Sequence, residues 1–180
     1  SAPRIASSLP LNYLVADRDN QRIYATARSN ICAFDWSGGT VRFLFQESCM
    51  GQVACHLCLS PDQRHLFCAN YISGNVTVFK ITDHGFEFTQ SITGKGHCGS
   101  NPERQNGPHA HYCSFINGNL YVVDLGQDAI FIFSWDGKKV GRELHRIVFP
   151  PGSGPRHIVY DPVQNRILCA GELSNELFVV

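Results

Sequence analysis

The sequence lacks the features that direct a protein to a nucleic acid or a membrane. Its 15 lysines and arginines are balanced by 15 aspartates and glutamates, and the basic residues form no cluster. Without a net positive field or a basic patch, a chain has no electrostatic footprint for nucleic acid or an anionic bilayer. No apolar run approaches the roughly 18 residues of a membrane span. We therefore expect neither nucleic acid nor membrane as a partner.

The chain also has no sign of an oxidising compartment. Residues 1–10 lack the basic start and apolar stretch of a secretory signal. The eight cysteines are scattered, and most lie in apolar runs, where a thiol behaves as a small hydrophobic group. The pair Cys55 and Cys58 has no second CxxC partner, and residues three apart on a strand point to opposite sides. We predict free thiols, a cytoplasmic location, and no metal or cofactor; a disulfide framework is the alternative.

Helical periodicity is nearly absent, and a repeat of strands takes its place. Four segments begin alike, at Tyr13, His56, His111 and His157, and each reads as strand, polar turn, strand, turn and strand. Residues 41–48, 86–92 and 142–149 fit as a fourth strand in three of these units. Four antiparallel strands in about 40–50 residues are typical of a β-propeller blade. The sequence predicts an all-β propeller, with a sandwich as the alternative.

The repeat indicates one domain, residues 1–180, of about four blades. The units lie near residues 11–50, 51–97, 108–150 and 151–180, and the last has only three strands. Residues 3–10 are a candidate for a further outer strand. If the four blades do not close on themselves, the chain is an open part of a larger ring. Its exposed strand edges then favour association with a second copy that completes the propeller; the alternative is that the sequence is a truncated piece of a longer, seven-bladed protein.

The propeller pattern also predicts where polar residues meet. In a blade, the loop entering the inner strand and the loop joining the second and third strands lie at the same end of the channel. We expect the following side chains to gather there: Arg28, His56, Asn70, Tyr71, His109, His111, Asp124, Arg156, His157 and Glu172. Arg104 belongs to a long insertion that is placed to reach over the channel mouth.

The repeat separates these residues by role. His56, His111 and His157 align at one repeat position, which indicates a recurring structural contact. His109 and Arg156 have no polar counterpart in the other units. A polar group that breaks the repeat is the better functional candidate, so we predict His109 as the catalytic histidine and His111 as a supporting residue.

Several motifs resemble those of the seven-bladed β-propeller lactonase family, which includes propeller-type 6-phosphogluconolactonases and carboxy-cis,cis-muconate cyclase. They are RQNGPHAH (104–111), YVVDLGQDAIFIF (121–133), GPRHIVYDP (154–162) and GELSNELFVV (171–180). The resemblance implies a histidine at His109 or His111, an arginine at Arg156 and a glutamate at Glu172. The sequence departs from the family pattern at Gly171, where an asparagine is usual. It also contains only about half of the family's seven blades.

The resemblance implies hydrolysis of a sugar lactone such as 6-phosphogluconolactone, with His109, Arg156 and Glu172 as catalytic residues. The substrate-binding residues are then Arg104, His111, Tyr71, Asp124, His56 and His157. A lactonase needs a polarised carbonyl, an activated water and a proton for the leaving oxygen. The same groups suit a muconate-type cycloisomerase that binds a dicarboxylate. A non-catalytic ligand- or protein-binding propeller is the second alternative; a metal-dependent sugar lactonase would need more acidic ligands than Asp124 and Glu172.

Overall fold

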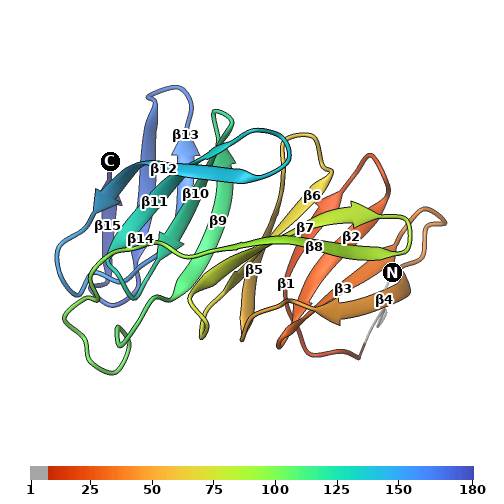
Figure 1. Cartoon of the computed structure of the whole chain (residues 1–180), viewed down its shortest axis with the longest axis horizontal. Coiled ribbons are helices and arrows are strands. Elements are labelled where there is room, and N and C mark those ends of the chain that lie inside the picture. Colours follow the sequence, from red (N-terminus) through yellow and green to blue (C-terminus); the bar gives the residue numbers. More distant parts are fainter. Residues whose placement is uncertain (1–7) are drawn as a thin grey trace, which may run out of the picture.

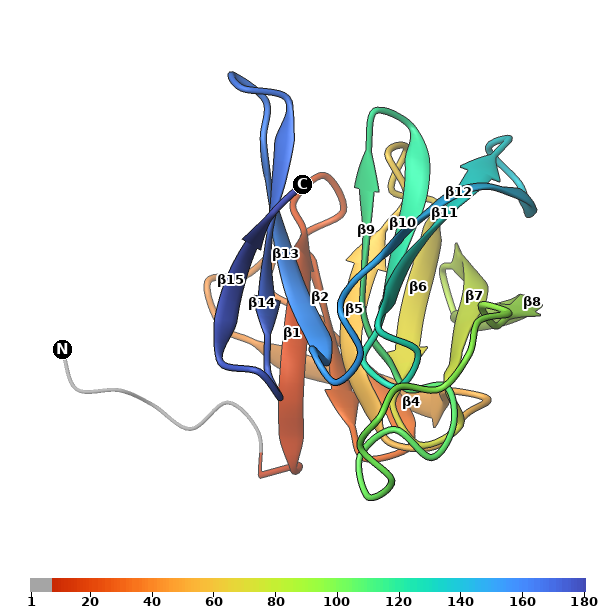
Figure 2. The same ribbon diagram turned by 90° about the vertical axis from the view of Figure 1, so that its left-hand side faces the viewer.

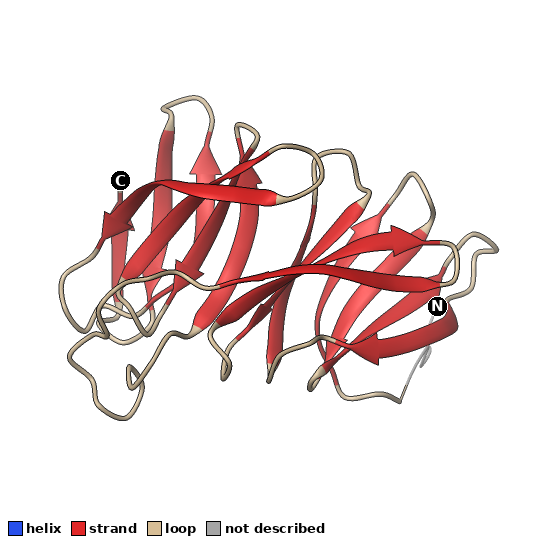
Figure 3. Ribbon diagram, in the orientation of Figure 1, coloured by secondary structure: helices blue, strands red, loops and turns tan. Residues whose placement is uncertain are grey.

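The computed structural model describes residues 8–180, which form four antiparallel sheets arranged as consecutive propeller blades (Figures 1 and 3). Three sheets have four strands and the last has three, so the all-β propeller prediction is confirmed. No helix in residues 8–180 is long and apolar enough to cross a bilayer. The expected extra strand at 3–10 falls mostly outside the described residues.

Each blade runs in chain order from its inner strand outward. The first blade contains β1 (Leu11–Asp17), β2 (Arg22–Ala27), β3 (Asn30–Asp35) and β4 (Arg42–Ser48). The second contains β5 (Ala54–Leu59), β6 (His65–Asn70), β7 (Asn75–Thr82) and β8 (Gly85–Ile92). The third contains β9 (Ala110–Ile116), β10 (Asn119–Asp124), β11 (Ala129–Trp135) and β12 (Val140–Val148). The fourth contains β13 (Pro155–Asp161), β14 (Arg166–Gly171) and β15 (Glu176–Val179).

The hydrophobic core lies between adjacent blades. Separate clusters join the first blade to the second, the second to the third, and the third to the fourth; they centre on Leu57, Phe67 and Ile158. Both faces of the middle blades are therefore apolar, because each sheet packs against two neighbours. The inner strands β1, β5, β9 and β13 meet in that order. The connection between β8 and β9 (green) runs past one end of the blades (Figures 1 and 2).

One irregularity recurs in the inner strand of every blade. The pairing register shifts by one residue near the start of each, so that one residue in each strand bulges out of the ladder. The four bulged residues are Asn12, Cys55, His111 and Arg156. A β-bulge redirects a side chain and is common beside active sites. All four bulged residues line the same cleft.

The residue that follows each bulge carries an aromatic ring. These four rings, Tyr13, His56, Tyr112 and His157, form a ladder around the channel. Their successive centroids are 4.1, 4.0 and 5.3 Å apart. Each blade thus contributes one ring to a continuous row of tilted ring contacts along the inner strands.

The positions of the bulges show that the repeat alignment expected from the sequence is wrong by one residue in the third blade. His56 and His157 do share a position, but its third-blade member is Tyr112, and His111 lies one residue earlier with Arg156. The physical reason is the first hairpin of the third blade, where only Asn117 and Gly118 separate β9 from β10. This turn is shorter than its counterparts, so an alignment that starts at the histidine is displaced by one residue.

Candidate active site

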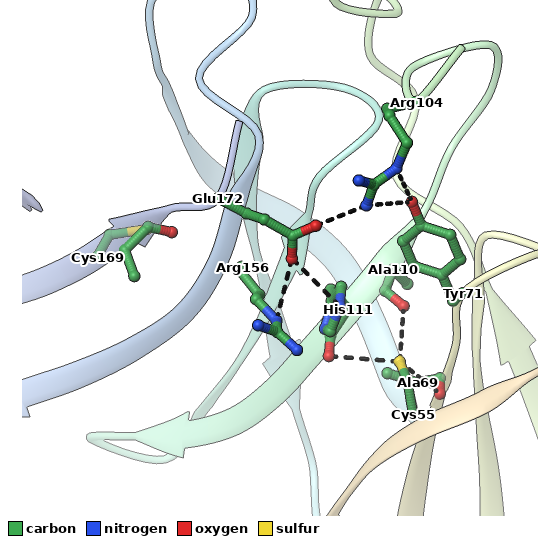
Figure 4. Close-up of polar contacts among 10 residues, drawn as sticks. Cys55, Ala69, Tyr71, Arg104, Ala110, His111, Arg156, Cys169 and Glu172 are labelled. Carbon is green, nitrogen blue, oxygen red and sulfur yellow. Dashed lines mark hydrogen bonds and ion pairs between the residues drawn. The ribbon is translucent and has the colours of Figure 1, made fainter. Parts of the chain in front are cut away.

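A cleft of about 410 Å³ lies where the bulged residues face the channel. Its lining residues are Asn12, Tyr13, Val53, Cys55, Tyr71, Arg104, His111, Arg156, His157 and Glu172. They come from the four inner strands, two turns, the segment that leads into β5 and the β8–β9 connection. The close-up in Figure 4 shows Glu172 between two arginines and beside His111.

The Glu172 carboxylate is the centre of the polar contacts in the cleft. Its Oε1 accepts a hydrogen bond from Arg104 Nη2 at 2.6 Å, and its Oε2 lies 3.2 Å from Arg156 Nε. The His111 Nε2 atom is 4.0 Å from the same Oε2. Glu172 follows β14 directly, and its backbone N–H is held by the carbonyl of Gly154. One carboxylate therefore faces two guanidinium groups and one imidazole.

Tyr71 fixes the direction of the Arg104 side chain. The phenol oxygen accepts hydrogen bonds from Arg104 Nε at 3.2 Å and Nη2 at 3.1 Å. Tyr71 lies in the turn after β6, and Arg104 lies in the β8–β9 connection, so two separate loops meet above the cleft. A planar guanidinium with two fixed partners is well oriented to bind an anion.

The charges in the cleft are determined by burial and by these contacts. Burial raises the pKa of Glu172, but the hydrogen bond from Arg104 and the charge of Arg156 outweigh it, so the pKa lies below its usual value. Burial, together with the charge of the nearby Arg156, lowers the pKa of His111 to about 4. At neutral pH the cleft thus has two cations, one carboxylate and the neutral imidazoles of His111 and His157. Its net charge favours an anionic ligand.

A buried carboxylate outside the cleft positions both arginines. Asp128 accepts hydrogen bonds from the backbone N–H groups of Gly152 and Gly154, at 2.8 and 2.7 Å. It also accepts one from the Gln105 side-chain amide at 2.7 Å. Gly154 is two residues before Arg156, and Gln105 follows Arg104 directly. Asp128 therefore joins the two segments that carry the arginines.

The structure places His109 outside the cleft. Its ring stacks on Tyr71 with centroids 4.6 Å apart, and its two nitrogens meet the Tyr71 carbonyl and the Asn106 side chain at 2.8 and 3.0 Å. Asp124, predicted as a substrate ligand, is also buried and accepts hydrogen bonds from the backbone N–H groups of His109 and Gln127. Both residues hold the loop that precedes β9. The role predicted for His109 passes to His111 in the proposal below.

The two remaining predicted histidines belong to the ring ladder. His56 is 2% exposed and lies between Tyr13 and Tyr112, outside the cleft lining. His157 lies at the edge of the cleft, where burial and the Arg156 charge lower its pKa. The cleft thus contains Tyr71, Arg104, His111, Arg156, His157 and Glu172 from the predicted set, and excludes His56, His109 and Asp124.

Sequence reasoning missed the cleft residues Asn12 and Cys55 and the positioning pair Gln105 and Asp128. Asn12 and Cys55 are bulge residues, and the inner-strand repeat, aligned on the aromatic ring, would have found them. Asp128 has a positive φ of 48° in the turn between β10 and β11. No sequence pattern signals that its carboxylate points at two distant backbone N–H groups.

Another hollow in the described residues, of about 590 Å³ between the second and third blades, lacks this combination of groups. Its lining includes the basic side chains of Arg64, Lys80 and Lys138. Its carboxylate, Asp62, is held by Ser60 and by the backbone N–H of Arg64. Within residues 8–180, no group of three or more His, Cys, Asp or Glu side chains is arranged to hold a metal ion.

Comparisons with known proteins agree with this fold. Residues 6–180 match a family described as "Lactonase, 7-bladed beta-propeller". The chain is 31% identical to the 6-phosphogluconolactonase of Bacillus subtilis (strain 168) over 191 residues, which cover 100% of this chain and 54% of that protein. The chain thus spans about half the length of this curated relative.

Solved structures also resemble this chain in fold. A putative 6-phosphogluconolactonase from Bacteroides fragilis superimposes with a TM-score of 0.82 at 26% identity, covering 93% of this chain and 52% of the other. The periplasmic gluconolactonase of Pseudomonas aeruginosa superimposes with a TM-score of 0.79 over 98% of this chain and 55% of its own length. At 24% identity, that second likeness shows the fold alone.

Proposed function

This chain belongs to the seven-bladed β-propeller lactonase family, and on that premise we propose that its channel cleft binds and hydrolyses an anionic sugar lactone. The substrate class is that of 6-phosphogluconolactone. Because the chain spans about half the length of its curated relative, the activity of the whole protein is part of the proposal. The catalytic groups we assign are Glu172, His111 and Arg156, with Arg104 and Tyr71 as substrate-binding residues.

One observation carries this proposal: Glu172 is held at once by Arg104 and Arg156 across the cleft. The side chains of Arg104 and Arg156 are 43% and 48% exposed, so both remain accessible from solvent. A phosphate or carboxylate has the geometry to take over these contacts, because a guanidinium binds either group through paired N–H donors.

Binding of an anion also prepares the base. A substrate anion that replaces Glu172 on the guanidiniums removes the interactions that keep its pKa low. Burial then dominates and raises the pKa of Glu172, which makes the carboxylate a stronger proton acceptor. The substrate thereby generates the base that acts on it.

His111 supplies the electrophile in this scheme. A neutral imidazole can donate an N–H to a carbonyl oxygen, and a lowered pKa keeps it neutral at working pH. Glu172 takes a proton from water as the oxygen of that water attacks the lactone carbonyl carbon. The ring C–O bond then breaks, and Glu172 returns the proton to the leaving oxygen. Arg156 stabilises the negative charge that develops on the carbonyl oxygen.

The two alternatives are separated by substrate and by turnover. A muconate-type cycloisomerase would use the same two arginines for two carboxylates of a diacid. A binding propeller would hold the anion without reaction. A single set of variants, assayed for binding and for turnover, distinguishes all three.

Binding is measured by calorimetry with 6-phosphogluconate, the ring-opened product. We expect at least a tenfold loss of affinity in Arg156→Ala and in Arg104→Ala, and none in Arg142→Ala, an exposed arginine of β12 with the same charge. Equal losses in all three variants would show that binding is non-specific.

Turnover is measured with 6-phosphogluconolactone and with carboxymuconate. We expect hydrolysis of the lactone, and its loss in Glu172→Gln with product binding retained. Unchanged hydrolysis in Glu172→Gln refutes the role of this carboxylate. Binding without any turnover favours the scaffold, and turnover of carboxymuconate alone favours the cycloisomerase.

A further inference from the structure

Two cysteines from neighbouring blades lie in direct contact behind the cleft. The Sγ atoms of Cys58, in β5, and Cys113, in β9, are 3.5 Å apart, although the residues are 55 positions apart in sequence. The eight cysteines of the chain are free thiols. The function proposed above uses neither of these two.

We propose that Cys58 and Cys113 form a redox pair, in which a small-molecule disulfide such as oxidised glutathione converts the two thiols to a disulfide between blades. A disulfide needs an S–S distance of about 2.05 Å, so the sulfur atoms would approach by about 1.5 Å. The cross-link would join the inner strands of the second and third blades, β5 and β9. The covalent connection between these strands otherwise runs only through the turns and strands that lie between them in the sequence (Figure 1).

The neighbouring thiols are directed elsewhere, which makes the pairing specific. Cys55 Sγ contacts the backbone carbonyls of Ala69, Ala110 and His111 at 3.4, 3.5 and 3.5 Å. Cys98 is exposed in the β8–β9 connection, away from the core between these blades. Cys58 is therefore the inner-strand thiol that points at Cys113.

The two thiols differ in exposure, which sets the order of reaction. Cys113 is fully buried, and burial raises its pKa well above the usual value. Cys58 is only partly buried, so we expect an external reagent to reach this thiol first. Its sulfur attacks one sulfur of the external disulfide, forming a mixed disulfide and releasing one small thiol. Cys113 then attacks the Cys58 sulfur and releases the second small thiol, and the two protein protons leave on the released thiols.

The cross-link would act on the wall of the cleft. Cys113 follows the bulged His111 by two residues, and its backbone N–H donates to His56 Nδ1 at 3.4 Å. Drawing β9 toward β5 therefore fixes the strand positions of two cleft residues, His111 and Cys55. The oxidised protein should be more resistant to unfolding because the link removes freedom from the unfolded chain.

The test is oxidation of the folded protein with excess oxidised glutathione, followed by non-reducing digestion and mass spectrometry. We expect a disulfide-linked pair of peptides that contain Cys58 and Cys113, reversed by dithiothreitol. We also expect a rise of several degrees in the thermal midpoint. Both effects should vanish in Cys58→Ala and persist in Cys98→Ser, in which only an exposed thiol is removed. Circular dichroism before and after oxidation establishes that the protein stays folded.

Absence of the linked peptides in folded wild-type protein overturns the proposal. A link from Cys113 to Cys55 overturns the assignment of the partner, and glutathione adducts on Cys98 alone show that the pair is closed to the reagent. None of these outcomes depends on lactone turnover, so the redox pair and the proposed activity can fail separately.

Discussion

Replacing Asp128 should loosen both arginine-bearing segments and cost much of the protein's stability. Its side chain is buried and accepts three hydrogen bonds, from Gly152, Gly154 and Gln105. Alanine leaves these donors without a charged acceptor, and each buried donor left unpaired costs about 1–3 kcal/mol. Because relaxation and water recover part of that loss, we expect Asp128→Ala to lower the free energy of unfolding by about 3–5 kcal/mol.

Urea unfolding followed by circular dichroism measures this change. With a slope of about 2 kcal/mol per molar urea, the midpoint should fall by about 2 M. Asp128→Asn tolerates the positive φ equally well and isolates the loss of the carboxylate charge, so it should lose less stability than Asp128→Ala.

Asp136→Ala is the matched control for this prediction. Asp136 also accepts two backbone hydrogen bonds, from Lys138 and Lys139, but in an exposed turn where water replaces the carboxylate. We expect a much smaller loss there. Equal losses at both positions, or a loss below about 1 kcal/mol in Asp128→Ala, would refute the reasoning from buried donors.

Three further predictions follow from the same structure. Burial lowers the pKa of His56 to about 3, against 6.5 in the unfolded chain, so the unfolded state binds the proton first. Stability should therefore decline as the pH falls from about 6.5 toward 3, and a pH series of urea midpoints should show a shallower decline in His56→Phe. Gly126→Ala should lower the thermal midpoint by many degrees because its Cβ would lie 1.9 Å from the Gly107 carbonyl oxygen, whereas Gly107→Ala meets nothing within 4 Å and should have little effect. Arg104→Ala removes a hydrogen bond from Glu172, so carbon-13 NMR titration should find the pKa of that carboxyl higher than in the wild type; an unchanged value would contradict the assignment.

Much of the fold could be predicted from the sequence because a propeller repeats a local pattern. The alternation of apolar and polar residues in a strand, and turn residues such as Asn117 and Gly118, are encoded within a few positions of the chain. The fourth strands expected at 41–48, 86–92 and 142–149 agree with the observed outer strands β4, β8 and β12. A pattern repeated along one chain needs no knowledge of distant contacts.

The site could be predicted only in part. Arg104, Arg156 and Glu172 were expected near the channel, and the structure brings all three together. His109 and His111 were both expected at the channel, but the bulge in β9 places His111 in the cleft and leaves His109 stacked on Tyr71.

The sequence by itself determined the class of fold, the repeat and the residues available for chemistry, because these depend on local alternation and composition. Only the tertiary structure decided which of those residues meet. Arg104 and Glu172, 68 positions apart, pair because two loops of different blades converge at one end of the channel. Asp128 reaches Gly154 and Gln105 for the same reason. Such contacts depend on the packing of whole blades against one another, and no short stretch of sequence contains that information.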